Sequence, residues 1–168
     1  MRKAAVALAL LAPLVLSACG GPAVATRKHH GLPRPVWTLP AYGVALRHPV
    51  GWKPAAGYLE RIEGKGGYVA VNALQGSGLT PRAAALGQAT QSLAPFGPDP
   101  VLRRATVDGQ PGYVILPEAG QAGDVAEAVV LYPKPQTISG VAYRYLVVTS
   151  TPQEILPILR GLRFLGGH

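Results

Sequence analysis

Apolar and polar residues alternate over a series of short segments, which predicts β-strands. The predicted strands are residues 37–39, 42–48, 58–63, 68–74, 101–107, 112–116, 125–132 and 141–150. Two connections have the composition of tight hairpins: Gly64-Lys65-Gly66-Gly67 and the dipeptide Asp108-Gly109. The strands that flank each of these connections are therefore expected to pair in antiparallel fashion.

The hydrophobic period changes to that of a helix after residue 79. Thr80 is a predicted N-cap, and Pro81 fits the first helical position. Leu86, Ala89 and Leu93 share one face, which we expect to be buried, and residues 95–97 are expected to stop the helix.

A second helix is predicted near the C-terminus. Thr151-Pro152-Gln153-Glu154 has the pattern of a capping box with proline at the first helical position. The expected buried stripe consists of Ile155, Leu156, Ile158, Leu159 and Leu162. Pro157 lies inside this stretch and is expected to bend the helix or to shorten its first part.

The strand predicted over residues 141–150 is apolar on both faces, with Tyr143 and Tyr145 on one face and Leu146 and Val148 on the other. A strand of this kind is expected at the centre of a sheet that is covered on both sides. Strands in two groups, each followed by a helix, predict an α+β fold in which helices flank an antiparallel β-sheet.

Residues 1–18 have the organisation of a secretory signal, with basic residues, an apolar run and then small residues. The apolar run is shorter than the about 20 residues that cross a bilayer. Leu16-Ser17-Ala18-Cys19 resembles a bacterial lipobox, in which the cysteine receives lipid and becomes the first mature residue. The sequence thus predicts a protein held by lipid on Cys19 to the extracytoplasmic side of a bacterial cell membrane or outer membrane. The alternative is a signal peptide cut after Ala18, which leaves Cys19 as a free thiol.

Residues 19–35 are rich in glycine, proline and basic side chains and predict a flexible tether before a globular domain at 36–168. The formal net charge of +8 includes two charges of the signal segment and three of the tether, at Arg27, Lys28 and Arg34. The remaining charges are interspersed, unlike the basic face of a nucleic-acid-binding domain. The tether charges are expected either to draw the domain toward anionic headgroups or only to keep the linker soluble.

No catalytic constellation emerges from the sequence. Cys19 is the only cysteine, so no disulfide or thiolate metal site is expected. Gly76-x-Gly78-x-x-Pro81 departs from the dinucleotide fingerprint because proline stands where glycine or alanine is needed for close helix packing. Few acidic residues and no cluster of Asp, Glu and His argue against a metal site. We therefore expect no enzymatic activity, no cofactor and no metal.

Several motifs, in order, resemble those of PsbP-like domains. They are Tyr42-x-Val44-x-Leu46-x-x-Pro49-x-Gly51-Trp52, Val107-x-Gly109-Gln110-Pro111-Gly112, Tyr143-x-Tyr145-x-Val147 and a final Leu162-Arg163-Phe164. The resemblance covers about residues 36–165. It implies an α/β/α sandwich of the kind found in bacterial envelope lipoproteins, the LpqN type among them, and in extrinsic photosystem proteins. It implies a binding or assembly role and supplies no catalytic residues.

Trp52, Tyr143 and Tyr145 are the candidate binding surface, because aromatic side chains with polar tips are common at interfaces. The alternative for all three is a place in the core. The expected function is that of a non-catalytic binding or assembly module of the cell envelope, with an envelope protein as partner. The second hypothesis is a carrier of a small apolar ligand or lipid between sheet and helix. An exposed aromatic patch would favour the first, and an apolar pocket the second.

Overall fold

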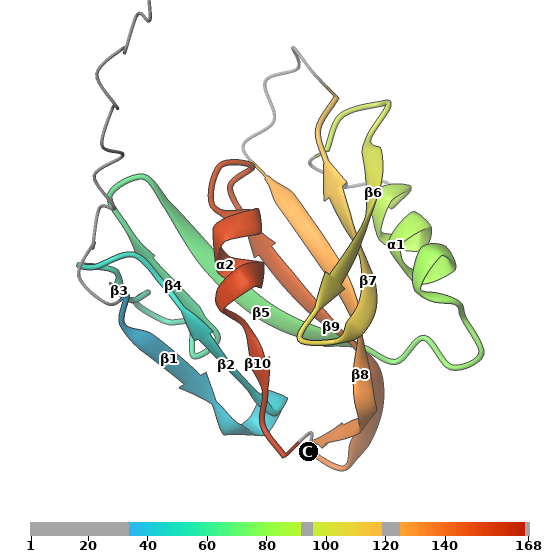
Figure 1. Ribbon diagram of the computed structural model, residues 1–168, viewed down its shortest axis with the longest axis horizontal. Coiled ribbons are helices and arrows are strands. Elements are labelled where there is room, and N and C mark those ends of the chain that lie inside the picture. Colours follow the sequence, from blue (N-terminus) through green and yellow to red (C-terminus); the bar gives the residue numbers. More distant parts are fainter. Residues whose placement is uncertain (1–33, 92–95, 119–124, 167–168) are drawn as a thin grey trace, which may run out of the picture. The chain divides into compact units, whose positions relative to one another are not determined.

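The computed structural model describes residues 34–91, 96–118 and 125–166 (Figure 1). The predicted signal segment, Cys19 and the tether as far as residue 33 lie outside the described residues, and so does Leu93. All helices and strands described below belong to the compact unit formed by Leu32–His168.

The larger sheet has seven strands in the order β3-β4-β5-β9-β8-β7-β6, and every neighbouring pair is antiparallel. Their bounds are β3 Lys53–Pro54, β4 Arg61–Gly64, β5 Gly67–Leu74, β6 Val101–Val107, β7 Gln110–Leu116, β8 Ala126–Ile138 and β9 Val141–Ser150. The predicted central position of residues 141–150 is confirmed, because β9 lies between β5 and β8 (Figure 1). An α+β fold built on an antiparallel sheet is likewise confirmed.

A smaller sheet has the order β1-β2-β10, formed by Val36–Leu39, Val44–Arg47 and Arg163–Phe164. The strand predicted over 42–48 begins two residues late, because η1 (Pro40–Tyr42) forms a 3-10 turn before it. Gly43 ends that turn with a positive φ of 62°, a conformation that glycine adopts without strain. The backbone N–H of Phe164 donates to the Asp108 carboxylate at 2.8 Å, which ties β10 to the β6–β7 turn.

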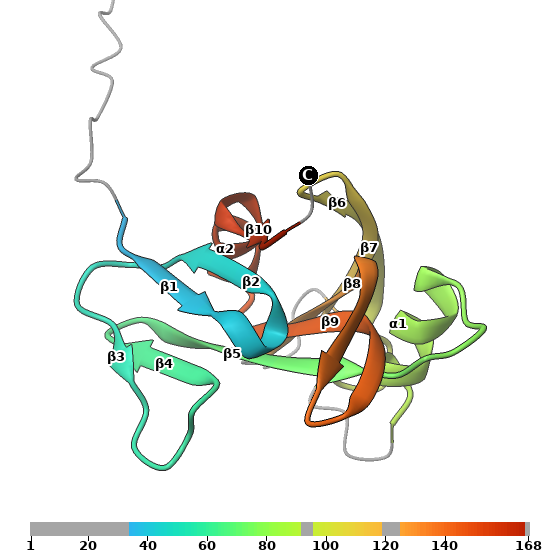
Figure 2. The ribbon, with the colours of Figure 1, turned by 90° about the horizontal axis from the view of Figure 1, so that it is seen from below.

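Two hydrophobic clusters lie on opposite faces of the larger sheet. The first joins the sheet to α2 (Ile155–Gly161) and the smaller sheet, and the second joins it to α1 (Pro81–Ala89). Along β8, Ala128 and Val130 belong to the first cluster and Val129 to the second, as the two-residue period of a strand requires. Figure 2 shows α1 and α2 on either side of β7 and β8.

Both predicted hairpins are present. At the β6–β7 turn, Asp108 and Gly109 have φ values of 48° and 79°, the two positive values that a type I′ turn needs. Gly64 pairs with Gly67 across the β4–β5 turn. The local sequence therefore sets both strand registers.

Helix α1 begins as predicted, because the Thr80 hydroxyl accepts the N–H of Ala83 at 3.2 Å and Pro81 follows. The expected buried face is right for Ala89, which is buried, and wrong for Leu86, which is exposed. The side toward β7 and β8 is formed by Ala84, Ala85 and Ala89, whose small side chains allow close packing on the sheet. The helix also ends before residue 95, with Thr90 as its C-cap.

Helix α2 starts at Ile155, after a turn in which the Glu154 N–H donates to the Thr151 carbonyl at 3.1 Å. The predicted capping box is wrong, because no side chain caps this helix. Four of the five predicted stripe residues are buried, whereas Leu156 is exposed. Pro157 lies in the first turn, where its missing N–H interrupts no helical hydrogen bond.

Strand β8 continues well beyond the predicted end at residue 132. Pro133 and Pro135 give that stretch the sequence of a loop, since proline cannot donate to a sheet ladder. The pairing with β9 shifts between Leu131 and Gln136, which places both prolines in an irregular segment, and resumes as far as Ile138. This irregular segment lines one of the hollows described next.

Candidate binding surface

The predicted surface of Trp52, Tyr143 and Tyr145 does not form. Trp52 is 6% exposed and Tyr145 is 0% exposed, so both belong to the core. Tyr143 is half-buried against the first cluster, whereas Tyr145 lies in the second. Tyr143 and Tyr145 do not share one face of the sheet. The register shift of β8 lies opposite these two tyrosines, and bulges increase the local twist of a strand.

The polar tips of the two buried aromatic residues are bound within the domain. The Tyr145 hydroxyl donates to the carbonyl of Leu79 at 2.5 Å, and the Trp52 indole N–H donates to that of Lys65 at 3.4 Å. The Tyr145 ring also lies on Gly76, where an added Cβ would come within 2.7 Å of the ring. The glycine in the Gly76-x-Gly78 motif therefore serves core packing.

An exposed aromatic surface is found instead where the β3–β4 connection lies beside β4 and β5. We call Tyr58, Leu59, Arg61 and Tyr68 the tyrosine–arginine patch. Tyr58 is 63% exposed and Leu59 is 87% exposed. The strand predicted over 58–63 is wrong in its first half, because Gly57 has a φ of 80° and the Tyr58 N–H closes a turn onto the Ala55 carbonyl.

Arg61 holds the patch together. Its guanidinium carbon lies 4.2 Å from the ring centroid of Tyr68 and 5.8 Å from that of Tyr58, both within the range of cation–π attraction. The same guanidinium pairs with Glu63 at 2.8 Å. The Arg61 side chain is therefore held by two rings and a carboxylate together.

A hollow of about 270 Å³ adjoins the patch and is lined by Tyr42, Tyr58, Glu60, Arg61, Ala70, Val71, Asn72 and Thr149. Burial, and next the charge of Glu60, raise the pKa of Tyr42, whose hydroxyl is hydrogen-bonded to the Glu60 side chain. The patch thus offers apolar area, a cation and polar groups within one region. Sequence periodicity did not reveal the tyrosine–arginine patch, because Tyr58 and Leu59 continue the apolar–polar alternation of the strand that follows them.

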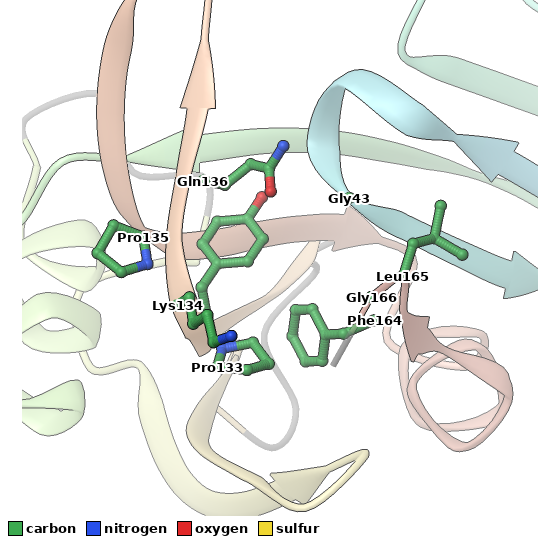
Figure 3. A pocket seen from close by; sticks show the side chains of 9 residues that line it. Gly43, Pro133, Lys134, Pro135, Gln136, Phe164, Leu165 and Gly166 are labelled. Atoms are coloured by element: carbon green, nitrogen blue, oxygen red, sulfur yellow. The ribbon is translucent and has the colours of Figure 1, made fainter. Parts of the chain in front are cut away.

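A second hollow, of about 250 Å³, lies between the proline segment of β8 and the end of β10 (Figure 3). The rings of Tyr132 and Phe164 meet edge to face beneath it, with centroids 5.6 Å apart. Both rings are buried, and the rest of the lining consists of Gly43, Pro133, Lys134, Pro135, Gln136, Leu165 and Gly166.

This hollow is small for a carrier, because pockets that enclose drug-sized ligands measure about 300–1,000 Å³. Its one unusual feature is the Tyr132 hydroxyl, which is buried and has no hydrogen-bond partner among the described residues. Burial raises the pKa of Tyr132. Gln136 closes one side by donating to the Ala41 carbonyl at 3.0 Å.

Glu127 is a buried acid that the sequence did not single out. Burial raises its pKa from 4.5 to about 7, and a 3.4 Å hydrogen bond from the Thr149 hydroxyl opposes that rise. Its other carboxyl oxygen has no hydrogen-bond partner within the described part of the chain. A raised pKa alone does not make a catalytic acid, which also needs a reacting group within reach.

Glu127 should make stability depend on pH. Its carboxyl group binds a proton more tightly in the folded chain, so its stabilising effect is complete below about pH 4.5 and is lost as pH rises through about 7. The free energy of unfolding is expected to fall by about 3 kcal/mol across that window. Glu127→Gln should flatten the profile measured by urea denaturation. The exposed control Asp99→Asn should keep the parental slope, and a parental slope in Glu127→Gln would contradict the assignment.

Within residues 34–91, 96–118 and 125–166, no three His, Cys, Asp or Glu side chains gather as metal ligands would. In the same residues, no helix is long and apolar enough to cross a membrane. His48 directly follows β2 and is buried, with its Nδ1 2.9 Å from the Pro49 carbonyl oxygen.

Comparisons with known proteins do not place the chain in a family. No protein-family model matches it, and no curated protein matches it either. The resemblance to PsbP-like domains therefore stays a prediction that rests on the sequence motifs.

Proposed function

We propose that this chain is a lipid-anchored, extracytoplasmic binding module of a bacterial cell envelope, without catalytic activity, and that a partner protein docks on the tyrosine–arginine patch. Two features support this proposal. One is the lipobox-like Leu16-Ser17-Ala18-Cys19 after a signal-like segment. The other, which carries the binding role, is an exposed aromatic and leucine surface on a domain whose core is otherwise closed.

The composition of the patch suits a protein partner. Tyrosine and arginine are among the residues that dominate binding energy at interfaces, especially where a rigid ring lies beside a desolvated group. Arg61 already stacks on Tyr68, so little of its side-chain freedom is lost on docking. Leu59 is 87% exposed and offers apolar area to a partner. A partner that presents a shallow apolar depression with a carboxylate at its rim would complement both features.

A PsbP-like α/β/α arrangement is the finer fold assignment that we propose. It is supported by the order of the sequence motifs and by hydrophobic clusters on both faces of the sheet, one with α1 and one with α2. PsbP-like lipoproteins are expected to bind or assemble, in line with the role proposed here. The carrier hypothesis places an apolar ligand between sheet and helix. A hollow of about 310 Å³ lies between β6 and α2, at the lower end of the volumes of ligand pockets. Its lining includes Arg104 and Arg160, which argues against an enclosed apolar site.

The test compares what the tagged, acylated protein captures from its native envelope after mild detergent extraction. Tyr58→Ser combined with Leu59→Ser should lower the recovery of the specific partner by at least about tenfold, since a hot-spot residue contributes about 2 kcal/mol or more. The patch does not contribute to the core, so the melting temperature should stay close to that of the parent.

Leu156→Ser is the matched control, because Leu156 is also an exposed leucine but lies on α2. This variant should capture the partner as the parent does. Equal capture by the parent and by the patch variant would show that the patch is not the docking site. Capture of lipid alone, with no protein above the level of a tag-only control, would favour the carrier.

A further inference from the structure

Three arginines from separate segments line one hollow of about 380 Å³. Arg34 precedes β1, Arg47 ends β2 and Arg160 lies in the last turn of α2, and Pro157 and Gly161 complete the lining. Arg163 does not join this lining and instead forms an ion pair with Asp108, with 3.6 Å between nitrogen and oxygen.

The backbone holds these arginines together. Val36 pairs with Arg47 in the smaller sheet, which brings the segment before β1 beside the end of β2. The Arg47 guanidinium donates to the Arg34 carbonyl at 3.3 Å. The Arg47 side chain also lies against Gly161, where an added Cβ would come within 2.8 Å of it. Glycine at position 161 therefore leaves room for Arg47 at the end of α2.

The positive charge of the hollow is only partly balanced. Glu154 lies 3.9 Å from Arg34, a long ion pair between partly exposed side chains. Among the described residues, no carboxylate forms an ion pair with Arg47 or Arg160. Like charges held near one another repel, and a bound anion would relieve that repulsion. Arginine also matches the geometry of phosphate oxygens better than lysine does.

We propose that Arg34, Arg47 and Arg160 bind the phosphate groups of anionic lipids, and that this hollow is the face on which the domain docks to the membrane. The inference rests on the proposed lipid anchor. Arg34 follows Cys19 by fifteen residues, and a chain of that length reaches at most about 50 Å. An anchored domain therefore keeps this hollow near the headgroups, which are the most abundant phosphates within its reach.

The test uses the acylated protein in vesicles of phosphatidylcholine, with or without phosphatidylglycerol, and a dansyl-labelled lipid. The chain has two tryptophans, Trp37 and Trp52, which serve as energy donors without further labelling. At low salt, transfer in the parent should be higher with phosphatidylglycerol than without it. Arg47→Gln combined with Arg160→Gln should lose at least half of that increase. The matched control, Arg82→Gln on α1 with Arg103→Gln on β6, should keep it, because neither residue lines the hollow.

The outcomes separate this inference from the anchor itself. If the arginine variant keeps the full increase, the hollow does not dock on the membrane. If phosphatidylglycerol gives no increase in the parent, while inorganic phosphate but not chloride of equal ionic strength raises its melting temperature, the hollow binds a free anion and the docking proposal is wrong. A protein that fails to float with vesicles of either composition would instead contradict the lipid anchor.

Discussion

Cys19→Ser is expected to abolish lipid attachment and to move the protein from the detergent phase to the aqueous phase in a phase-partition assay. The expectation follows from the lipobox-like motif, since the thiol of Cys19 is the only group that can accept the thioether-linked lipid. Two acyl chains give stable membrane binding, whereas one gives only marginal binding. Incorporation of labelled palmitate should therefore fall to background in the same variant.

Ser17→Ala is the control for this experiment, because it keeps a small residue in the motif and leaves Cys19 in place. It should partition and incorporate label as the parent does. If Cys19→Ser still partitions into detergent and still incorporates label, lipid attachment at Cys19 is wrong. The proposed location at the membrane would then need another anchor.

Tyr145→Ala is expected to remove a large part of the stability of the domain. The side chain is fully buried in the second cluster, its ring covers Gly76 and its hydroxyl bonds to Leu79. Truncation of a large buried aromatic residue costs about 3–5 kcal/mol, against a typical total of about 5–15 kcal/mol. The free energy of unfolding in urea measures the loss.

Tyr145→Phe separates the two contributions, because it keeps the ring and removes the hydrogen bond to Leu79, for an expected loss of about 1 kcal/mol. The exposed Tyr58→Ala should change stability by less than about 0.5 kcal/mol. A Tyr145→Ala protein that is as stable as the parent would show that β9 is not packed on both faces.

The features that were predictable from the sequence are those fixed by local chemistry or by strong periodicity. Asp108-Gly109 determines a hairpin because two successive positive φ values suit those residues. Thr80 and Pro81 mark the start of α1 in the same local way. Residues 141–150 identified the centre of the sheet, because apolar side chains on both faces suit only a covered strand.

The features that were missed depend on contacts between distant segments. Alternation could not show that Gly57 would turn the chain and leave Tyr58 and Leu59 in solvent. Nor could it show that β8 would continue past Pro133 through a register shift. Next to the same shift, Tyr143 and Tyr145 belong to different hydrophobic clusters. The binding surface predicted from their two-residue spacing is therefore wrong.

The arginine hollow illustrates the same limit. Arg34, Arg47 and Arg160 lie far apart in sequence, and each alone resembles an ordinary solvated charge. Only the pairing of β1 with β2 and the position of α2 beside them bring the three together. Binding surfaces made from several segments carry no local signal, which is why the sequence supported the anchor better than the docking sites.

Site-specific photo-crosslinking in living cells tests the proposed binding role most directly. A photoreactive phenylalanine analogue replaces Leu59 in the patch or, as the comparison, Lys134 at the rim of the hollow beside Tyr132. A protein partner on the patch predicts a discrete protein adduct from position 59 that is absent from position 134. A lipid or small-molecule adduct from position 134, with no protein adduct from position 59, would contradict the binding module and favour the carrier.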